Sequence, residues 1–257
     1  MKDLFDISGR VAIVTGGSRG IGKMIAAEFV KRGVKTYITS RKAKPCLETA
    51  EQLSVFGDCI AIPYDLSTSE GIGGFIEEIS GRENHLDILI NNAGAAWTAP
   101  FDDFPESGWD KVMNINVKSV FFLTQRLAPL LRFGASQEQP SKVINIASID
   151  GLRTPRLETY SYVASKAGLI GMTGLMAKRL IRDNIIVNGI APGAFSSDMN
   201  ITARDEPDRV AAVIPAQRIG RPDDIAGTAV YMCSRAGDYL VGTTIAVDGG
   251  LVYAKTD

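Results

Sequence analysis

Short β-branched apolar runs alternate with longer segments of helical period along the whole chain. The short runs are nearly continuous in apolar residues, as expected of strands that are covered on both faces. They predict strands at Val11–Val14, Val34–Thr39, Cys59–Ile62, Ile88–Ile90, Val143–Ile146, Ile185–Ile190 and Thr243–Ala246. The longer segments predict helices at Gly22–Lys31, Lys44–Val55, Ser69–Ser80, Trp109–Leu131 and Ser161–Ile181.

This alternation predicts an α/β fold, a doubly wound parallel seven-stranded sheet with helices on both faces. The predicted elements use almost all of the 257 residues. No stretch has the composition of a linker, and no period of about 20–50 residues repeats. We therefore expect a single domain over residues 1–257.

Composition and charge exclude several classes of function. The chain has 28 Lys and Arg against 29 Asp and Glu, so its overall charge gives no reason to expect nucleic acid or an anionic membrane as partner. No apolar run is long enough for a membrane span, and the N-terminus is too polar for a signal peptide. Three scattered cysteines and one histidine offer no zinc ligand set. We expect a metal-free protein of a reducing compartment, the cytoplasm.

A glycine-rich turn follows the first predicted strand. Gly16, Gly20 and Gly22 can adopt turn conformations closed to other residues and let backbone N–H groups approach a pyrophosphate. The helix that starts there directs its positive end at the same place. The spacing G-x-x-x-G-x-G differs from the common G-x-G-x-x-G fingerprint. The turn favours a dinucleotide ligand, and a tight turn that binds nothing is the alternative.

The end of the second predicted strand indicates which dinucleotide. Proteins that bind NAD carry an acidic residue about 20 positions after the turn, which accepts from the ribose 2′-hydroxyl. Here Ser40 and Arg41 stand in that region, without a carboxylate. Arg41 and Arg19 offer planar donors suited to a 2′-phosphate, so we expect NADP(H) to be preferred over NAD(H). Asp65, after the third strand, can accept from an adenine amine or cap the next helix.

Tyr162 and Lys166 are the strongest candidates for chemistry. They are four residues apart and therefore neighbours on one helix face. A free phenol has a pKa near 10, and a nearby ammonium is expected to lower that pKa. Such a pair is suited to interconvert a ketone and an alcohol. Tyr160 has no such partner, because Ala164 stands four residues after it.

The pair of Tyr162 and Lys166 makes several other polar residues candidates for the same site. Ser148 ends the fifth predicted strand, where ligands meet a doubly wound sheet, and its hydroxyl can hold a carbonyl. Asn116 lies among apolar residues, as a satisfied core amide or as a kink that holds water. Asn92 follows the fourth strand, in a turn that either lies against a cofactor or binds nothing. We expect His85 at the surface and Cys233 in the core.

Taken together and in this order, these motifs resemble the short-chain dehydrogenase/reductase family over essentially the whole chain. The matching pieces are Thr15–Gly22, Asp65-Leu66, Asn91–Gly94, Asn116, Ser148, Tyr162 with Lys166, Pro192-Gly193 and Val247–Gly250. The resemblance implies a Rossmann fold that binds NAD(P) and a catalytic tetrad of Asn116, Ser148, Tyr162 and Lys166. With the arginines above, the expected cofactor contacts are Gly16, Ser18, Arg19, Gly20, Ile21, Gly22, Ser40, Arg41, Asp65, Leu66, Asn92, Ala93, Gly94, Tyr162, Lys166, Pro192, Gly193, Phe195 and Ser197.

The resemblance also implies roles for these residues. Tyr162 would be the acid/base, and Ser148 would orient and polarise the carbonyl. Lys166 would hold the nicotinamide ribose and lower the phenol pKa, and Asn116 would anchor a water that connects the relay to solvent. Ser197 stands where the family usually has threonine. Because the hydroxyl is kept, we expect cofactor binding to be kept too.

Within the family, the sequence is similar to NADPH-dependent 3-oxoacyl-[acyl-carrier-protein] reductases, including the rhamnolipid-pathway type. The similar segments are Arg19 with Ser40-Arg41, Ser107–Met113, Ile190–Gly193 and Gly220–Pro222. We expect reduction of a 3-oxoacyl thioester to a secondary alcohol. A sugar, polyol or other small-alcohol dehydrogenase is the alternative within the same enzyme class. A non-catalytic protein that senses the cofactor is the alternative from another class.

The resemblance further implies partners and a lid. Residues 194–217 should form the lip over the substrate. The family forms homotetramers in which the segments 109–131 and 161–181 pack between subunits. A basic patch can dock an acidic acyl carrier protein or can simply be solvated helix faces, and its residues are Arg126, Arg132, Lys178, Arg179 and Arg182.

Overall fold

The computed structural model describes residues 3–254, which contain a seven-stranded sheet in the order β3-β2-β1-β4-β5-β6-β7. Every neighbouring pair of strands is parallel. The strands are β1 (Val11–Thr15), β2 (Lys35–Thr39), β3 (Cys59–Ala61), β4 (Ile88–Asn91), β5 (Ser141–Ile146), β6 (Ile185–Pro192) and β7 (Thr244–Val247). The predicted parallel seven-stranded sheet is confirmed, with strand ends that shift by one to two residues.

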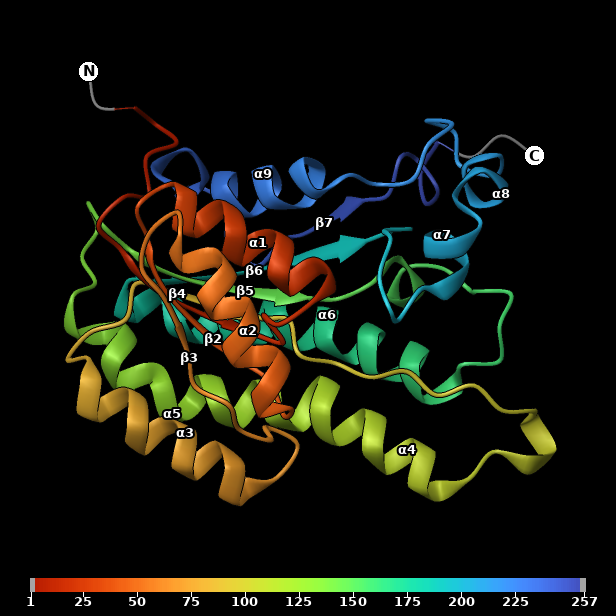
Figure 1. Cartoon of the computed structure of the whole chain (residues 1–257), viewed down its shortest axis with the longest axis horizontal. Coiled ribbons are helices and arrows are strands. Elements are labelled where there is room, and N and C mark those ends of the chain that lie inside the picture. Colours follow the sequence, from red (N-terminus) through yellow and green to blue (C-terminus); the bar gives the residue numbers. More distant parts are fainter. Residues whose placement is uncertain (1–2, 255–257) are drawn as a thin grey trace.

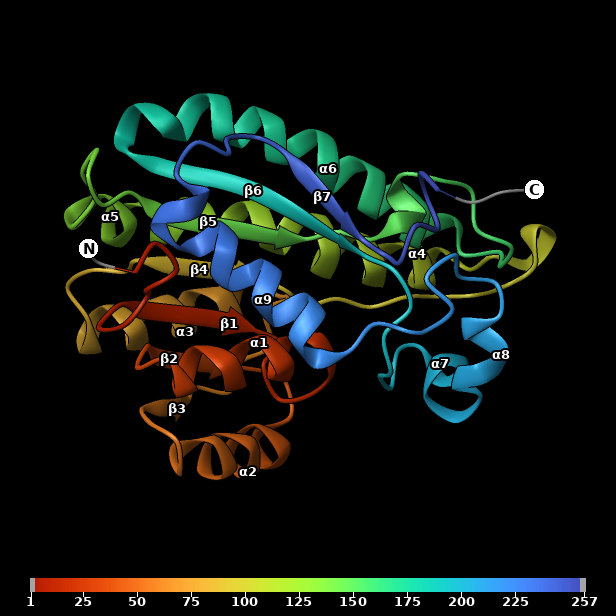
Figure 2. The ribbon, with the colours of Figure 1, turned by 90° about the horizontal axis from the view of Figure 1, so that it is seen from above.

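Helices cover both faces of the sheet (Figure 1). One face carries α1 (Gly20–Lys31), α2 (Ala43–Ser54) and α9 (Pro222–Cys233). The other face carries α3 (Ser69–Arg82), α4 (Glu106–Met113), α5 (Ser119–Phe133) and α6 (Tyr160–Leu180). Two short helices, α7 (Ile201–Asp205) and α8 (Pro207–Ala211), lie beyond the carboxyl ends of β6 and β7 (Figure 2).

Successive side chains of each strand point to opposite faces of the sheet, so the apolar core is divided into two layers. In β1, Ala12 and Val14 belong to the cluster that packs against α1 and α9. Val11 and Ile13 point the other way, into the cluster that includes residues of α3, α5 and α6. All of β1 is buried, because a central parallel strand is covered on both faces. The prediction that Cys233 lies in the core is confirmed.

Two helical segments differ from the prediction. The expected helix Trp109–Leu131 is interrupted, because a π-helical stretch at Asn114–Lys118 separates α4 from α5. The sequence analysis also missed α9, although Pro222 at its start and Asp224 in its first turn are recognised helix-start signals. The side chain of Asp224 accepts a hydrogen bond from the backbone N of Arg221 at 2.7 Å.

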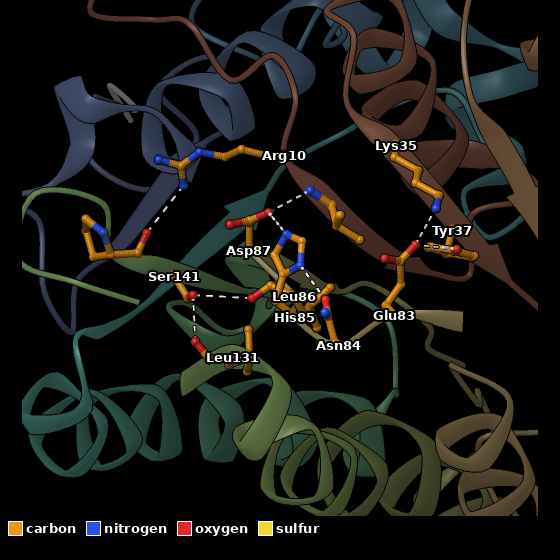
Figure 3. A network of polar contacts seen from close by, with 12 residues as sticks. Arg10, Lys35, Tyr37, Glu83, Asn84, His85, Leu86, Asp87, Leu131 and Ser141 are labelled. Atoms are coloured by element: carbon orange, nitrogen blue, oxygen red, sulfur yellow. Dashed lines mark hydrogen bonds and ion pairs between the residues drawn. The ribbon is translucent and has the colours of Figure 1, made fainter. Parts of the chain in front are cut away.

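A polar network ties the amino ends of the central strands together (Figure 3). Asp87 Oδ2 accepts from Val11 N at 2.7 Å and lies 3.4 Å from His85 Nε2. Tyr37 donates to Glu83 at 2.6 Å, and Lys35 pairs with the same carboxylate. The predicted surface position of His85 is therefore only partly right, since its side chain is about one third exposed (36%) and lies within this network. The network is at the edge of the sheet opposite to the glycine turn.

Three further features concern the thiols, the acidic and histidine side chains, and the helices of residues 3–254. Cys46, Cys59 and Cys233 are buried free thiols. No group of three or more His, Cys, Asp or Glu side chains in that range is arranged to hold a metal ion. None of the helices between residues 3 and 254 is both long enough and apolar enough to cross a bilayer.

Candidate active site

The order of strands reverses between β1 and β4, and the loops that follow these two strands meet there. Thr15, at the end of β1, accepts hydrogen bonds from the backbone N atoms of Asn92 and Ala93, each at 2.9 Å. The amide side chain of Asn92 donates back to the Thr15 carbonyl at 2.8 Å. A crevice at such a reversal is where open α/β sheets bind their ligands.

The glycine turn between β1 and α1 needs its glycines for two physical reasons. Gly16 and Gly20 have φ values of 64° and 54°, which side chains other than glycine rarely adopt. A Cβ at Gly22 would lie 2.4 Å from both the Asn92 side-chain nitrogen and the Gly16 carbonyl oxygen. At the start of α1, no side chain of the described residues caps the helix, and its first turn holds no acidic residue. The first N–H groups of α1 are therefore available to an anion.

Asn116 occupies the middle of the π-helical stretch and is 1% exposed. Its side chain accepts from Ala95 N and donates to Ala95 O, both at 2.9 Å. It also donates to Ser165 Oγ at 2.9 Å, and Ser165 donates to the Tyr162 carbonyl at 2.7 Å. Asn116 therefore connects the loop after β4 to the helix that carries Tyr162, as a fully engaged buried amide.

Ser148, Tyr162 and Lys166 come together at the end of β5 and the start of α6. Ser148 follows β5, is 7% exposed and accepts from Asp150 N at 3.1 Å. The ammonium nitrogen of Lys166 lies 5.6 Å from the centroid of the Tyr162 ring and donates to the Ile146 carbonyl at 2.7 Å. The predicted placement of Tyr162 and Lys166 on one helix face beside Ser148 is confirmed.

The comparisons with known proteins show the family of the chain. The model of the family described as short chain dehydrogenase matches residues 10–208. The chain belongs to this family. It is 44% identical to the rhamnolipids biosynthesis 3-oxoacyl-[acyl-carrier-protein] reductase of Pseudomonas aeruginosa, over 97% of this chain and 99% of that protein.

A solved structure and a second relative extend the comparison. A solved structure titled Pseudomonas aeruginosa RhlG/NADP active-site complex is 44% identical, with a TM-score of 0.94 over 98% of this chain and 100% of that one. The 2-dehydro-3-deoxy-D-gluconate 5-dehydrogenase of Escherichia coli is 38% identical, over 96% of each chain. The protein is therefore an oxidoreductase that acts on a CH–OH group with a nicotinamide cofactor, as the sequence analysis expected.

The residues present fit such a cofactor. The uncapped start of α1 and the positive-φ glycines before it form a cradle of backbone N–H groups suited to a pyrophosphate. The buried ammonium of Lys166 provides three donors, of which one is used by Ile146, so it can also hold a sugar hydroxyl.

The protonation of the acid/base pair differs from the expectation. Burial raises the pKa of Tyr162 to about 12, and the charge of Asp150 acts in the same direction, while a hydrogen bond with Ser148 lowers it. The expected lowering by Lys166 is not found, because desolvation of the phenolate dominates and Lys166 donates to Ile146 instead. Burial also lowers the pKa of Lys166 itself to about 8.

The two arginines expected at a 2′-phosphate have different surroundings. Arg41 is exposed just after β2. Arg19 is also exposed, and its guanidinium pairs with Asp198 Oδ2 at 2.7 Å. Ser40 donates to the Lys42 carbonyl at 3.2 Å, which closes the turn between β2 and α2.

The remaining predicted contact residues lie around the same edge of the sheet. Asp65 accepts from the backbone N and the hydroxyl of Ser67, at 3.0 and 2.6 Å, and Thr68 is the N-cap of α3. The possible role of Asp65 as helix cap is therefore wrong. Phe195 is 2% exposed and packs against Gly220, so only its backbone can face a cofactor.

Several contacts of the site were missed by the sequence analysis. Ser165 joins Asn116 to α6, and its position three residues after Tyr162 was the available signal. A chain of buried side chains runs below the site, in which Asn91 donates to Asn145 and Asn145 donates to Thr173, each at 2.9 Å. Only the pairing of β4 with β5 brings the first two together.

Proposed function

We propose that this enzyme is an NADPH-dependent reductase that converts a 3-oxoacyl thioester to the 3-hydroxyacyl thioester. The observation that carries the chemistry is the placement of Tyr162 beside Ser148 and the buried Lys166 at the carboxyl end of β5, which pairs with β4 at the strand-order reversal. The substrate class rests on the 44% identity to a 3-oxoacyl-[acyl-carrier-protein] reductase over nearly the full length of both chains.

Each member of the site has a distinct task in this proposal. Tyr162 donates its phenolic proton to the carbonyl oxygen, to which Ser148 also donates a hydrogen bond. A pKa of about 12 keeps the phenol protonated at neutral pH, which suits the reductive direction. When bound, the reduced nicotinamide supplies the hydride to the carbonyl carbon. Lys166 holds the ribose, and Asn116 is a positioning residue that holds Ser165.

The preference for NADP(H) over NAD(H) is part of this proposal. Arg19 and Arg41 flank the glycine turn and the end of β2, and guanidinium groups suit a phosphate. Replacing Arg41 by alanine should weaken NADPH far more than NADH, measured as dissociation constants by fluorescence titration. Equal losses for the two cofactors would contradict the phosphate assignment.

A sugar acid or polyol is the second candidate substrate. The half-buried Asp150 and Arg153 lie two and five residues after Ser148, and the Nε of Arg153 is buried with no hydrogen-bond partner among the described residues. A carboxylate and a guanidinium beside the site would suit a hydroxylated, charged substrate better than an acyl chain. The 38% identity to a gluconate-type dehydrogenase supports the same candidate.

A panel of ketones separates the two candidates. The enzyme is assayed with NADPH against a 3-oxoacyl-CoA, a 3-oxoacyl-acyl carrier protein and 5-keto-D-gluconate, following absorbance of the reduced cofactor. The proposal expects the highest kcat/KM with an acyl thioester. If 5-keto-D-gluconate is reduced and no acyl thioester is, the substrate class is the second one.

The lid, the oligomer and the acyl carrier protein are further parts of the proposal. Residues 194–217 form the lid, supported by the exposed apolar side chains of Met199, Ile201 and Val213 in this segment. A homotetramer is supported by the exposed Phe121 and Phe122 on α5, and sedimentation equilibrium tests it.

Docking of an acyl carrier protein on the basic patch has weaker support. Arg132 and Arg179 of the basic patch both pair with Asp183, at 2.8 and 3.0 Å, as expected of solvated helix faces. If the carrier-bound substrate has no lower KM than the CoA form, the patch is not a docking site. The three free thiols suit the reducing cytoplasm.

A further inference from the structure

Asp198 joins the glycine turn to the proposed lid through two ion pairs. Its Oδ2 lies 2.7 Å from Nη1 of Arg19, the residue immediately before α1. Its Oδ1 lies 3.0 Å from Arg204 Nη1, in α7. Among residues 3–254, the pair of Arg19 and Asp198 is the ion pair that connects the turn with the segment 194–217.

The close approach of Ser197 to Gly20 also places Asp198 near the glycine turn, independently of the charges. A Cβ on Gly20 would lie 3.3 Å from the Cβ of Ser197, so the residue before Asp198 lies directly over the turn. Figures 1 and 2 both place the segment between β6 and α7 beside the start of α1. The carboxylate of Asp198 is therefore held near Arg19 by the path of the main chain.

The partner of Arg19 matters because this arginine has a second candidate ligand. The proposed function assigns Arg19, with Arg41, to the 2′-phosphate of NADPH. A guanidinium that is bonded to a carboxylate must exchange it for the phosphate, and the displaced carboxylate then repels the phosphate if it stays nearby. NADH has no 2′-phosphate, so its binding does not require Arg19 to exchange its partner.

We propose that Asp198 is a specificity-determining residue that competes with the 2′-phosphate of the cofactor for Arg19, and that the phosphate breaks the ion pair between Asp198 and Arg19 when it binds. The inference rests on the proposed preference for NADPH. When Arg19 turns to the phosphate, Asp198 keeps Arg204 as its partner within the lid. A phosphorylated cofactor thereby breaks the ion pair between Arg19 and Asp198, and an unphosphorylated cofactor leaves it in place.

The test uses two nucleotides that differ only in the 2′-phosphate, adenosine 2′,5′-bisphosphate and adenosine 5′-monophosphate. Their dissociation constants are measured by calorimetry on the full chain and on Asp198→Asn. A single exposed ion pair contributes weakly, so we expect the preference for the bisphosphate to rise about 1.4- to 5-fold. NADPH should gain in the same way relative to NADH.

Asp205→Asn is the matched control. Asp205 also pairs with Arg204, at 2.8 Å, and its replacement changes the net charge by the same amount. No contact between Asp205 and Arg19 occurs in residues 3–254, so the preference for the bisphosphate should not change. An equal gain in this control would overturn the inference, because the effect would then follow from net charge alone.

Arg19→Ala separates the inference from the proposed function. If Arg19→Ala weakens the bisphosphate selectively while Asp198→Asn leaves the preference unchanged or lowers it, the competition by Asp198 is wrong and the NADPH assignment stands. If Arg19→Ala and Arg41→Ala both weaken the two nucleotides equally, the NADPH assignment fails first.

Discussion

Replacing Lys166 with methionine is expected to stabilise the protein at neutral pH while it abolishes turnover. Lys166 is 5% exposed, and burial lowers its pKa from 10.5 to about 8. The lowered pKa means that the charged form of Lys166 is less stable in the folded protein than in the unfolded chain. The active site thus keeps a destabilising group for the sake of its chemistry.

The magnitude follows from the difference between the two pKa values. The fall from 10.5 to about 8, at about 1.4 kcal/mol per pKa unit, is a cost of about 3 kcal/mol at pH 7. Methionine removes this cost and also the hydrogen bond from Lys166 to the Ile146 carbonyl, which contributes about 1–2 kcal/mol. The net expectation is a variant about 1–2 kcal/mol more stable than the native chain.

The difference must also depend on pH with a defined sign. Below about pH 8 both the folded and the unfolded native chain carry the Lys166 proton, and the full cost is present. Between about pH 8 and the unfolded pKa of 10.5, only the unfolded chain binds this proton, so the native chain gains stability relative to the variant. The advantage of the methionine variant therefore disappears as the pH approaches 10.5.

Urea unfolding followed by circular dichroism, at pH 7 and pH 10 and one protein concentration, measures this difference. Lys178→Met is the control, because Lys178 is exposed on the same helix α6 and its replacement should change little at either pH. The reasoning is refuted if Lys166→Met is less stable than the native chain at pH 7 and the gap does not change with pH.

Three other expectations concern the site and its support. Tyr162→Phe should abolish ketone reduction and leave the dissociation constant of NADPH nearly unchanged; retained turnover would refute the role of the phenol. Gly22→Ala should lower the free energy of unfolding by about 2–3 kcal/mol, measured in urea, because the new Cβ would lie 2.4 Å from two atoms. Gly227→Ala in α9 should raise that free energy by about 0.5–1 kcal/mol, because its Cβ would meet nothing within 4 Å. Asp238→Ala should cost about 3 kcal/mol because it leaves the fully buried Lys142 ammonium without its partner at 2.6 Å, and the double variant with Lys142→Met should recover most of this loss.

The sequence by itself determined the features that depend on local pattern. Strand and helix periods predicted the parallel sheet, since the burial of successive residues follows directly from the geometry of each element. The four-residue spacing predicted that Tyr162 and Lys166 share a helix face. The predicted turn conformations are found at Gly16 and Gly20, which have positive φ, but not at Gly22, which lies within α1. These properties need no knowledge of distant residues.

Only the tertiary structure decided what depends on residues far apart in the chain. Ser165 meets Asn116 across 49 positions, and Asp198 meets Arg19 across 179. The pKa of Tyr162 rises to about 12 because several elements, distant in sequence, bury the phenol. This burial outweighs the lowering of the pKa that was expected from Lys166 on the same helix. Proton affinity and long-range ion pairs are properties of the packed molecule, and for that reason the spacing of residues indicated the chemistry but not its energetics.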